Sequence, residues 1–382
     1  MSERWPDKYI IGLTGNIATG KSVVRKMLEH LGAFGVDADR LSHMAMSKDG
    51  PAYKQVVSTF GNFILSPSGE IDRTKLGNIV FGNAEALAQL EKLVHPVVRQ
   101  AVNILVKRAK QKVVVIEAIK LLEGELAEYC DTVWVTDASA NTQLNRLTNK
   151  RKHSLEDAKR RIQAQTPQTD KLTRADVVIE NSGAFEDTWK QVQAKWAKIS
   201  SGVAPAKPKP AVKRKVAGLA TIEIQRGGPG DAEMLAGFIN AIGNPPQPLT
   251  RLDVMMAFGE KAFLYAVSDG KPVALAGWQV ENLVTRVSEL YIDSSSPAAV
   301  LRPLLNAVEE ASGDLQSEAA LLFVTPTLNN TAAAVFKQAG YALTEVDDLR
   351  FAVWKSAAKE SQPPGTVLLV KPLREGRVLR PL

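Results

Sequence analysis

A short stretch near the start of the chain constrains its fold more than any other feature. Residues 15–22 read GNIATGKS, which matches the pattern G-x-x-x-x-G-K-[ST] of a phosphate-binding loop. A predicted strand, Tyr9–Leu13, precedes the loop, and Lys21–Leu31 follows it with the apolar spacing of a helix. In this setting backbone N–H groups point at phosphate oxygens, and the helix N-terminus adds positive charge. We therefore expect a nucleotide to be bound by Gly15, Asn16, Ile17, Ala18, Thr19, Gly20, Lys21 and Ser22.

Two side chains of this loop, and two carboxylates beyond it, have predicted chemical roles. Lys21 is expected to reach the β- and γ-phosphates of ATP, and the Ser22 hydroxyl is expected to coordinate Mg²⁺. Asp37 and Asp39 follow the first helix, and residues two apart on a strand point to the same side. One carboxylate could then assist the magnesium ion while the other accepts a proton from an attacking hydroxyl. The spacing equally allows Asp39 to cap a helix at Arg40–Met46.

The N-terminal half alternates predicted strands and helices. Val113–Ile116 is a continuous β-branched run, typical of a strand that is buried on both faces, and Thr132–Val135 is a further strand. Leu155–Gln165 is a charged predicted helix. This alternation predicts an α/β fold, with a parallel sheet covered by helices.

Composition limits the class of protein. A formal net charge of +7 and a pI of about 9.3 suit anionic ligands. The lone Cys130 excludes a disulfide framework within the chain and a cysteine-rich zinc site, and we expect it to be a partly buried, inert thiol. No apolar run approaches the roughly 18 residues that span a bilayer, and residues 1–9 lack the apolar core of a signal peptide. We therefore expect a cytoplasmic protein that does not enter membranes, and the sequence leaves its oligomeric state open.

A stretch rich in proline and lysine divides the chain. Residues 202–215 read GVAPAKPKPAVKRK, which predicts an exposed, semi-stiff linker. A nucleic-acid-binding arm is the alternative, but it is disfavoured because the basic run is short and has no interleaved aromatic residues. The predicted organisation is a phosphate-loop domain at 1–200, a linker at 201–217, a second α/β unit at 218–358 and a tail at 359–382. Within the tail, the strand-like run Thr366–Val370 is expected to be an edge strand or a loose end.

Several separated motifs resemble, in order, those of the dephospho-coenzyme A kinase family. They are Asp37-Ala38-Asp39, Ile71-Asp72-Arg73 with Ile79-Val80-Phe81, Leu90-Glu91 with His95-Pro96, Gln143 with Arg146, Arg161 with Gln165, and Ala175–Ile179 with Asn181 and Gly183. The resemblance covers about residues 9–195. It implies a P-loop nucleoside-kinase-like core with a helical insertion and a lid. It also implies that the γ-phosphate of ATP is transferred to the 3′-hydroxyl of dephospho-CoA, with Mg²⁺ as the metal.

The resemblance also implies roles for single residues. Asp39 would be the general base, Lys21 would hold phosphates, and Arg146 would stabilise the transferring charge from the lid. Asn181 would contact the nucleotide. The acceptor would be bound by Asp37, Arg73, His95, Glu123 and Arg151.

Two departures from the family pattern keep an alternative open. The segment Ile119–Glu123 retains its glutamate but lacks the proline of the family and carries a lysine. The second lid arginine falls on Lys150, with Arg151 one residue later, and lysine cannot make a bidentate phosphate contact. A P-loop kinase for another nucleoside-like acceptor is therefore the alternative. Glu117, directly after a strand, is expected to face either Mg²⁺ or a structural or solvent environment.

The C-terminal half has the element order of the GNAT acetyltransferases, a strand, a helix, a hairpin across Asp269-Gly270, a strand and a helix. The segment Asn330–Tyr341 resembles that family's closing motif. Its CoA-binding loop, however, would fall at Ser294–Ala299, which has no glycine and contains a proline without an N–H. We therefore expect an accessory or CoA-binding α+β domain, with CoA or acetyl-CoA as its ligand. A bifunctional kinase and N-acetyltransferase is the alternative, in which Glu289 would be a base.

Overall fold

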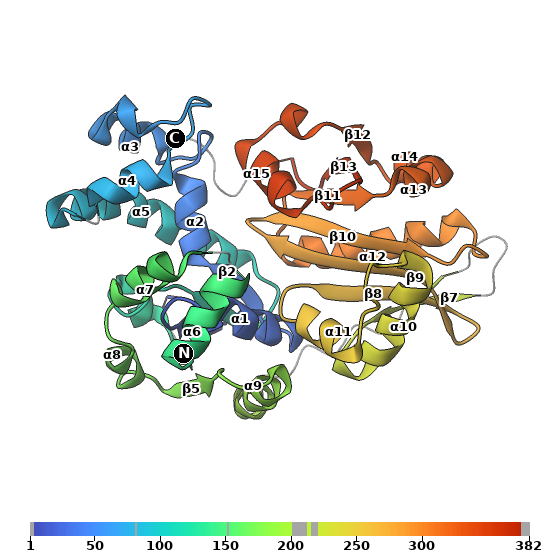
Figure 1. The fold of residues 1–382 in the computed structure, drawn as a ribbon, viewed down its shortest axis with the longest axis horizontal. Helices are drawn as coiled ribbons and strands as arrows, with labels where there is room; N and C mark the ends of the chain where they lie inside the picture. Colours follow the sequence, from blue (N-terminus) through green and yellow to red (C-terminus); the bar gives the residue numbers. More distant parts are fainter. Residues whose placement is uncertain (1–3, 81, 151–152, 201–211, 215–220, 376–382) are drawn as a thin grey trace. The chain divides into compact units, whose positions relative to one another are not determined.

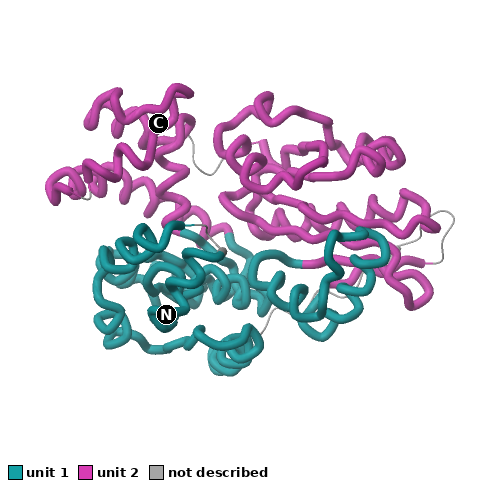
Figure 2. Tube along the Cα trace, in the orientation of Figure 1, with its two compact units in different colours: residues 1–37, 109–211, 227–262 teal, residues 38–108, 212–226, 263–382 magenta. Residues whose placement is uncertain are grey.

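The computed structural model describes residues 4–80, 82–150, 153–200, 212–214 and 221–375 (Figure 1). The chain forms two compact units, and each takes residues from both halves of the sequence (Figure 2). The first unit comprises residues 1–37, 109–211 and 227–262, and the second comprises residues 38–108, 212–226 and 263–382. Most of the predicted linker lies outside the described residues, and the domain boundaries at 200, 217 and 358 stay predictions.

A five-stranded parallel sheet forms the centre of the first unit, in the order β2-β3-β1-β4-β5. Its strands are β1 (Tyr9–Thr14), β2 (Phe34–Asp37), β3 (Val113–Glu117), β4 (Thr132–Asp137) and β5 (Val177–Glu180). All five residues of β3 are buried, as its β-branched composition predicts. The expectation of a parallel sheet with helices around it is confirmed.

Seven α-helices belong to the described residues of the first unit. They are α1 (Lys21–His30), α6 (Ala140–Asn145), α7 (Leu155–Gln163), α8 (Gln168–Leu172), α9 (Phe185–Ser200), α10 (Ala232–Gly243) and α11 (Arg251–Ala257). Met27 of α1, Trp134 of β4 and Trp196 of α9 belong to one core cluster. The sequence analysis did not predict α9, although its aromatic residues fill this core. A π-helical turn, Arg146–Lys150, continues α6.

An eight-stranded sheet forms the centre of the second unit, in the order β12-β13-β11-β10-β9-β8-β7-β6. Its strands are β6 (Val212–Arg214), β7 (Ile222–Arg226), β8 (Ala262–Ser268), β9 (Lys271–Glu281), β10 (Val284–Ile292), β11 (Ala319–Val324), β12 (Ala342–Thr344) and β13 (Val367–Pro372). β10 and β11 are parallel, whereas β9 and β10 are antiparallel. The predicted hairpin across Asp269-Gly270 is confirmed, and both residues have positive φ, as a tight turn between β8 and β9 requires.

The strand-like run near the end of the chain lies inside this sheet. β13 pairs with β11 on one side and with β12 on the other, so neither an edge strand nor a loose end describes it, and both expectations were wrong. Leu368 and Leu369 are almost fully buried there. The short strand β12 pairs with β13 and is itself the edge strand of the sheet.

The helices of the second unit fall into two sequence regions. The first is the helical insertion, with α2 (Ala38–Ala45), α3 (Tyr53–Phe60), α4 (Arg73–Val80) and α5 (Ala84–Arg108). The second accompanies the sheet, with α12 (Leu301–Asp314), α13 (Pro326–Thr331), α14 (Ala333–Gln338) and α15 (Ala352–Ser361). Among the described helices of the whole chain, none has both the length and the apolar character to cross a membrane.

Candidate active site

The phosphate loop connects β1 to α1, and its shape depends on glycine at two positions. Gly15 has φ 147° and Gly20 has φ 96°, in the region of backbone space that favours glycine. A Cβ atom at Gly20 would lie 1.9 Å from the Asn181 side-chain nitrogen, and one at Gly15 would lie 2.5 Å from the Thr136 carbonyl oxygen. The loop is therefore packed closely against the β4 and β5 ends of the sheet.

Lys21 is buried and folds back over the loop from the first turn of α1. Its Nζ atom donates hydrogen bonds to the carbonyl oxygens of Gly15, at 2.9 Å, and Asn16, at 3.2 Å. These bonds hold the ammonium group across the mouth of the loop, where it can meet a phosphate. The geometry agrees with the predicted role of Lys21.

A buried group of charges lies beside the loop, on α1 and β3. Ser22 Oγ donates to Glu117 Oε1 at 2.9 Å, and Arg25 Nε donates to Glu117 Oε2 at 2.6 Å. Glu117 is 3% exposed, so the solvent-facing alternative for it was wrong. Arg25 also pairs with Glu29, and although burial opposes it, Glu29 and Glu117 raise the pKa of Arg25 above its ordinary value.

The same group bears on magnesium binding. Mg²⁺ takes hard oxygen ligands and keeps several water molecules, so one or two protein oxygens and the substrate phosphates are enough to hold it. Ser22 Oγ and Glu117 Oε1 supply such oxygens side by side. Among the described residues, no group of three or more His, Cys, Asp or Glu side chains could hold a metal ion. The donor set fits an ion that is held mainly by phosphates and water.

Asp37 and Asp39 do not form the same-side strand pair that their spacing predicted. β2 ends at Asp37, which lies opposite Glu117 of β3 in the register of the sheet. α2 begins at Ala38, so Asp39 lies within the first turn of a helix. The strand interpretation of this pair was therefore wrong, because the chain changes from strand to helix between the two carboxylates. Asp39 does not cap this helix either, since the helix starts at Ala38 and its N-cap position is residue 37.

Arg146 and Asn181 reach the loop from two later segments. Arg146 donates to the carbonyl oxygens of Ala18, at 3.0 Å, and Asn181, at 2.7 Å. Asn181 Nδ2 donates to the Thr19 carbonyl oxygen at 2.8 Å, and its Oδ1 accepts from Thr188. Burial lowers the pKa of Arg146, and Glu180 opposes this shift; the guanidinium is a cation at neutral pH because its ordinary pKa lies far above 7. The structure thus brings both predicted residues to the loop.

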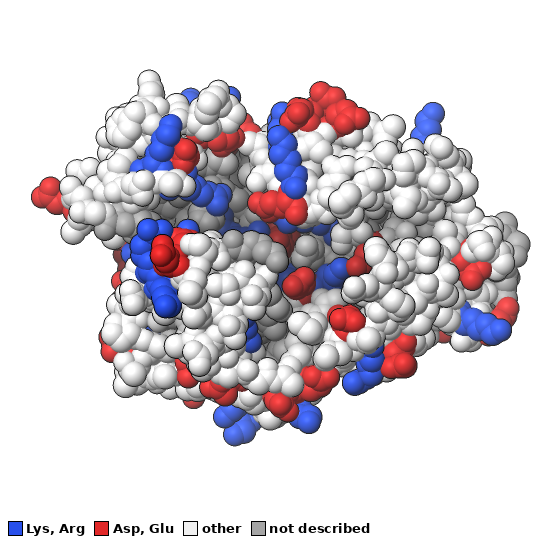
Figure 3. Space-filling view, in the orientation of Figure 1, with Lys and Arg blue, Asp and Glu red and all other residues white. Residues whose placement is uncertain are grey.

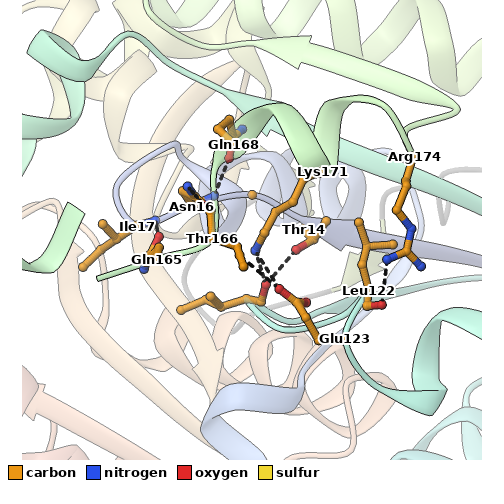
Figure 4. Close-up of polar contacts among 12 residues, drawn as sticks. Thr14, Asn16, Ile17, Leu122, Glu123, Gln165, Thr166, Gln168, Lys171 and Arg174 are labelled. Carbon is orange, nitrogen blue, oxygen red and sulfur yellow. Dashed lines mark hydrogen bonds and ion pairs between the residues drawn. The ribbon is translucent and has the colours of Figure 1, made fainter. Parts of the chain in front are cut away.

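Two glutamine side chains also hold the loop, and Figure 4 shows how they approach it. Ile17 N donates to Gln165 Oε1 at 2.7 Å, and Asn16 N donates to Gln168 Oε1 at 3.0 Å. The Asn16 side chain completes the contact by donating to the Thr166 carbonyl oxygen at 3.0 Å. Gln165 belongs to a motif of the sequence analysis, but Gln168 was missed. The only sequence signal for Gln168 was its position three residues after Gln165, which the motif already included.

The altered wall after β3 is anchored by the same segment. Lys171 is buried, and its Nζ donates to the Ile119 carbonyl oxygen at 2.6 Å, which also accepts from Thr14 Oγ1 at 3.0 Å (Figure 4). Arg174 donates to the Leu122 carbonyl oxygen at 2.9 Å, and Thr166 donates to Glu123 at 3.2 Å. These bonds fix the backbone of the wall although its family proline is absent. The sequence analysis named Glu123 but none of the four residues that hold the wall.

The remaining predicted site residues lie in the second unit or outside the described residues. Asp39 is on α2, Arg73 begins α4, and His95 is an exposed residue of α5. Partial burial lowers the pKa of Arg73, and Arg40 lowers it further, while Glu360 raises it. Arg151 lies outside the described residues.

Two further expectations can be compared with the structure. Cys130 is partly buried, as expected, and burial, with help from Asp131, raises the pKa of its thiol to about 12, which disfavours the reactive thiolate. On the face drawn in Figure 3, lysines and arginines lie among aspartates and glutamates rather than gathering into one basic surface.

Comparison with solved structures finds relatives for both halves. A dephospho-CoA kinase from Campylobacter jejuni is 29% identical, with a TM-score of 0.35, and covers 51% of this chain and 100% of its own. The GNAT domain of S. lividans PAT is 18% identical, with a TM-score of 0.33, and covers 42% of this chain and 96% of its own.

Comparison of sequences concerns the N-terminal half. The family model described as dephospho-CoA kinase matches residues 9–187. The dephospho-CoA kinase of Carboxydothermus hydrogenoformans is 41% identical over 186 residues, which are 48% of this chain and 90% of the relative. That of Geobacter sulfurreducens is 38% identical over 192 residues, 50% of this chain and 98% of the relative. Since nearly the whole length of these relatives is matched, the chain belongs to the dephospho-CoA kinase family.

Proposed function

We propose that this chain transfers the γ-phosphate of ATP to the 3′-hydroxyl of dephospho-CoA, with Asp39, Lys21 and Arg146 as its catalytic residues. Membership of the family supports the reaction, and the contacts around the phosphate loop support the roles of Lys21 and Arg146. The nucleotide phosphates would be bound by residues 15–22, with Asn181 bracing the loop.

The chemistry of the transfer explains why these residue types are needed. The 3′-oxygen forms a bond to the γ-phosphorus, the bond from that phosphorus to the β–γ bridging oxygen breaks, and ADP leaves. Asp39 would take the proton that the hydroxyl loses. The transition state is loose and carries its charge on the phosphoryl oxygens, so positioned cations contribute more than covalent help. Lys21 and Arg146 supply two such cations.

The observation that carries this assignment is the attachment of Arg146 to the loop. Its guanidinium bonds to Ala18 and Asn181, so that one cation from the lid is placed against the phosphate-binding backbone. An arginine held by carbonyl oxygens is already oriented before the substrate arrives, which lowers the cost of ordering it.

Ser22 and Glu117 would hold Mg²⁺ beside the loop, Glu117 through a water molecule or directly. When bound, the ion would neutralise charge on the β- and γ-phosphates. Arg25 Nε binds one oxygen of Glu117, which leaves the other oxygen directed at Ser22. The acceptor would be bound by Asp37, Arg73, His95, Glu123 and Arg151. We also place the reaction in the cytoplasm, where ATP is available and the thiol of the product stays reduced.

The test of the assigned base is the substitution Asp39→Asn in the full chain. The amide cannot accept the proton, so kcat should fall by about 10²–10⁴-fold, while KM for ATP and for dephospho-CoA stays within a few-fold. The matched control is Asp7→Asn. Asp7 is an exposed aspartate outside both the phosphate loop and α2, so this substitution should leave kcat and both KM values unchanged. A raised KM with an unchanged kcat would refute the role of Asp39 as base.

For the C-terminal half, we propose a binding or scaffolding role rather than acetyl transfer. Asp293 accepts from the Ser295 backbone N–H at 2.8 Å, so that one amide of the loop after β10 is already paired with a carboxylate and is not available to a phosphate. Pro297 in the same loop has no N–H to offer. The full chain, given acetyl-CoA and a panel of amines, should release no CoA thiol above the rate of hydrolysis. Amine-dependent thiol release would instead establish a bifunctional enzyme.

A further inference from the structure

Within the second unit, three polar contacts join the helical insertion, residues 38–108, to the C-terminal residues 263–382. Arg40 Nη1 of α2 lies 3.2 Å from Glu281 Oε2 at the end of β9. The Ala352 N–H at the start of α15 donates to Asp49 Oδ2 at 3.0 Å. The buried Gln316 side chain donates to the Leu105 carbonyl oxygen of α5 at 2.7 Å. The insertion and the C-terminal sheet therefore share a polar interface in three places.

Glu281 is the centre of the first contact, because it touches two arginines. Its Oε2 atom lies 3.2 Å from Arg40 and 3.3 Å from Arg286 Nη1 of β10. Arg286 is 3% exposed and also binds Glu360 of α15 at 3.1 Å and the Ser361 hydroxyl at 2.8 Å. Glu281 is thus a bridge from the core of the sheet to α2.

The two halves of this bridge have different strengths. A buried guanidinium is costly unless it is paired, so Arg286 fixes Glu281 firmly. The side chain of Arg40 is 37% exposed, and a pair so near the surface changes an equilibrium by about fivefold at most. The bridge is therefore too weak to determine folding, and its effect would be confined to the orientation of α2.

That helix carries the proposed base. Asp39 and Arg40 are neighbours in the first turn of α2, which has only eight residues. We propose that Glu281 is a positioning residue for the phosphoryl transfer, which holds Arg40 and thereby orients Asp39. This inference rests on the proposed role of Asp39. It makes the C-terminal half a contributor to the kinase reaction, although none of the kinase motifs lies there.

The test compares four variants of the full chain, Glu281→Gln, Arg40→Gln, the double variant and the control Glu345→Gln. Glu345 is an exposed glutamate on the same C-terminal half. Loss of the bridge should lower kcat for dephospho-CoA by about 2–5-fold and leave KM for ATP within twofold, because the phosphate loop is untouched. The double variant should be no slower than either single variant, since both remove one interaction. The control should match the wild type.

A second measurement does not depend on turnover. Hydrogen exchange of the α2 amides should be faster in Glu281→Gln and in Arg40→Gln, and exchange of the α1 amides should be unchanged. Unchanged exchange in α2, or rate losses that multiply in the double variant, would overturn the positioning role. If Asp39→Asn does not lower kcat, the assignment of Asp39 as the base is refuted. Hydrogen exchange of the α2 amides would still show whether the contact between Arg40 and Glu281 holds this helix.

Discussion

At the scale of single residues, the phosphate loop depends on a close fit between a glycine and an asparagine. Gly20 has a positive φ, and its Cα hydrogen faces the Asn181 side chain, which in turn holds the Thr19 carbonyl oxygen. Any side chain at residue 20 must displace Asn181 and strain the backbone. The motif therefore requires glycine here for two separate physical reasons.

The substitution Gly20→Ala tests this fit. The added methyl group should push Asn181 off the loop and raise KM for ATP by at least about tenfold, because the amides lose their arrangement around the phosphates. Steady-state kinetics with varied ATP measure the effect. The control is Gly230→Ala, where no atom lies within 4 Å of the new Cβ and φ is not positive. Equal KM values for both variants would show that the fit is unimportant.

The residues of the loop were predictable because they are contiguous in sequence, whereas Arg146, Asn181 and Gln165 were found only through the family resemblance. The loop could be read directly, since eight adjacent residues carry its chemistry. Gln168 and Lys171 could not, because each meets its partner through tertiary contacts across more than about fifty residues and neither belongs to a local pattern. Asp39 is a different case, because the sequence identified the residue but not its position inside the helix α2.

At the scale of elements, α1 carries a group of buried charges, which Arg25 connects to Glu117 of β3. Glu29 accepts from Arg25 at 2.5 Å and from Lys26 at 2.9 Å. Burial opposes its ionisation, but Lys26 and Arg25 together lower the pKa of Glu29 from 4.5 to about 2. Because the folded pKa is the lower one, ionised Glu29 stabilises the fold above about pH 4.5. This stabilisation is lost as the pH falls toward 2.

Glu29→Gln should therefore lower the free energy of unfolding at pH 7 by about 2–4 kcal/mol, since it leaves two buried cations with a weaker partner. The difference between wild type and variant should shrink as the pH falls from 4.5 toward 2. Urea unfolding at several pH values measures it. A difference that stays constant over this range would mean that the charge of Glu29 contributes nothing.

β13 is the element that the sequence assigned least well. Its residues were recognised as strand-like, but proline on either side suggested an edge or a loose end, and only the pairing with β11 and β12 reveals an interior strand. Sequence periodicity reports how a strand is buried and says little about which strands flank it.

The interior position of β13 predicts unequal costs for two leucines of neighbouring strands. Leu369→Ala on β13, where the side chain is 3% exposed, should lower the free energy of unfolding by about 2–5 kcal/mol. Leu343→Ala on β12, where the side chain is 62% exposed, should change it by less than about 0.5 kcal/mol. Thermal and urea unfolding provide the comparison. Similar, small losses for both would place β13 at the periphery.

At the scale of the whole molecule, the two compact units do not coincide with the two halves of the sequence. The nucleotide loop belongs to one unit, and the helical insertion with the proposed base belongs to the other, together with the C-terminal sheet. The parallel sheet and the hairpin across Asp269-Gly270 could be predicted from apolar runs and turn signals. The grouping of residues 38–108 with residues 263–382 could not, because it depends on contacts such as Arg40–Glu281 and Gln316–Leu105 between distant segments.

The central claim is that this loop, with Lys21, phosphorylates dephospho-CoA. The direct measurement follows ADP and CoA together when the full chain is given ATP, Mg²⁺ and dephospho-CoA, with other nucleosides as competing acceptors. Wild type should form one CoA per ADP and prefer dephospho-CoA, and Lys21→Ala should be slower by at least about a hundredfold. ADP without CoA, preference for another acceptor, or full turnover by Lys21→Ala would contradict the account.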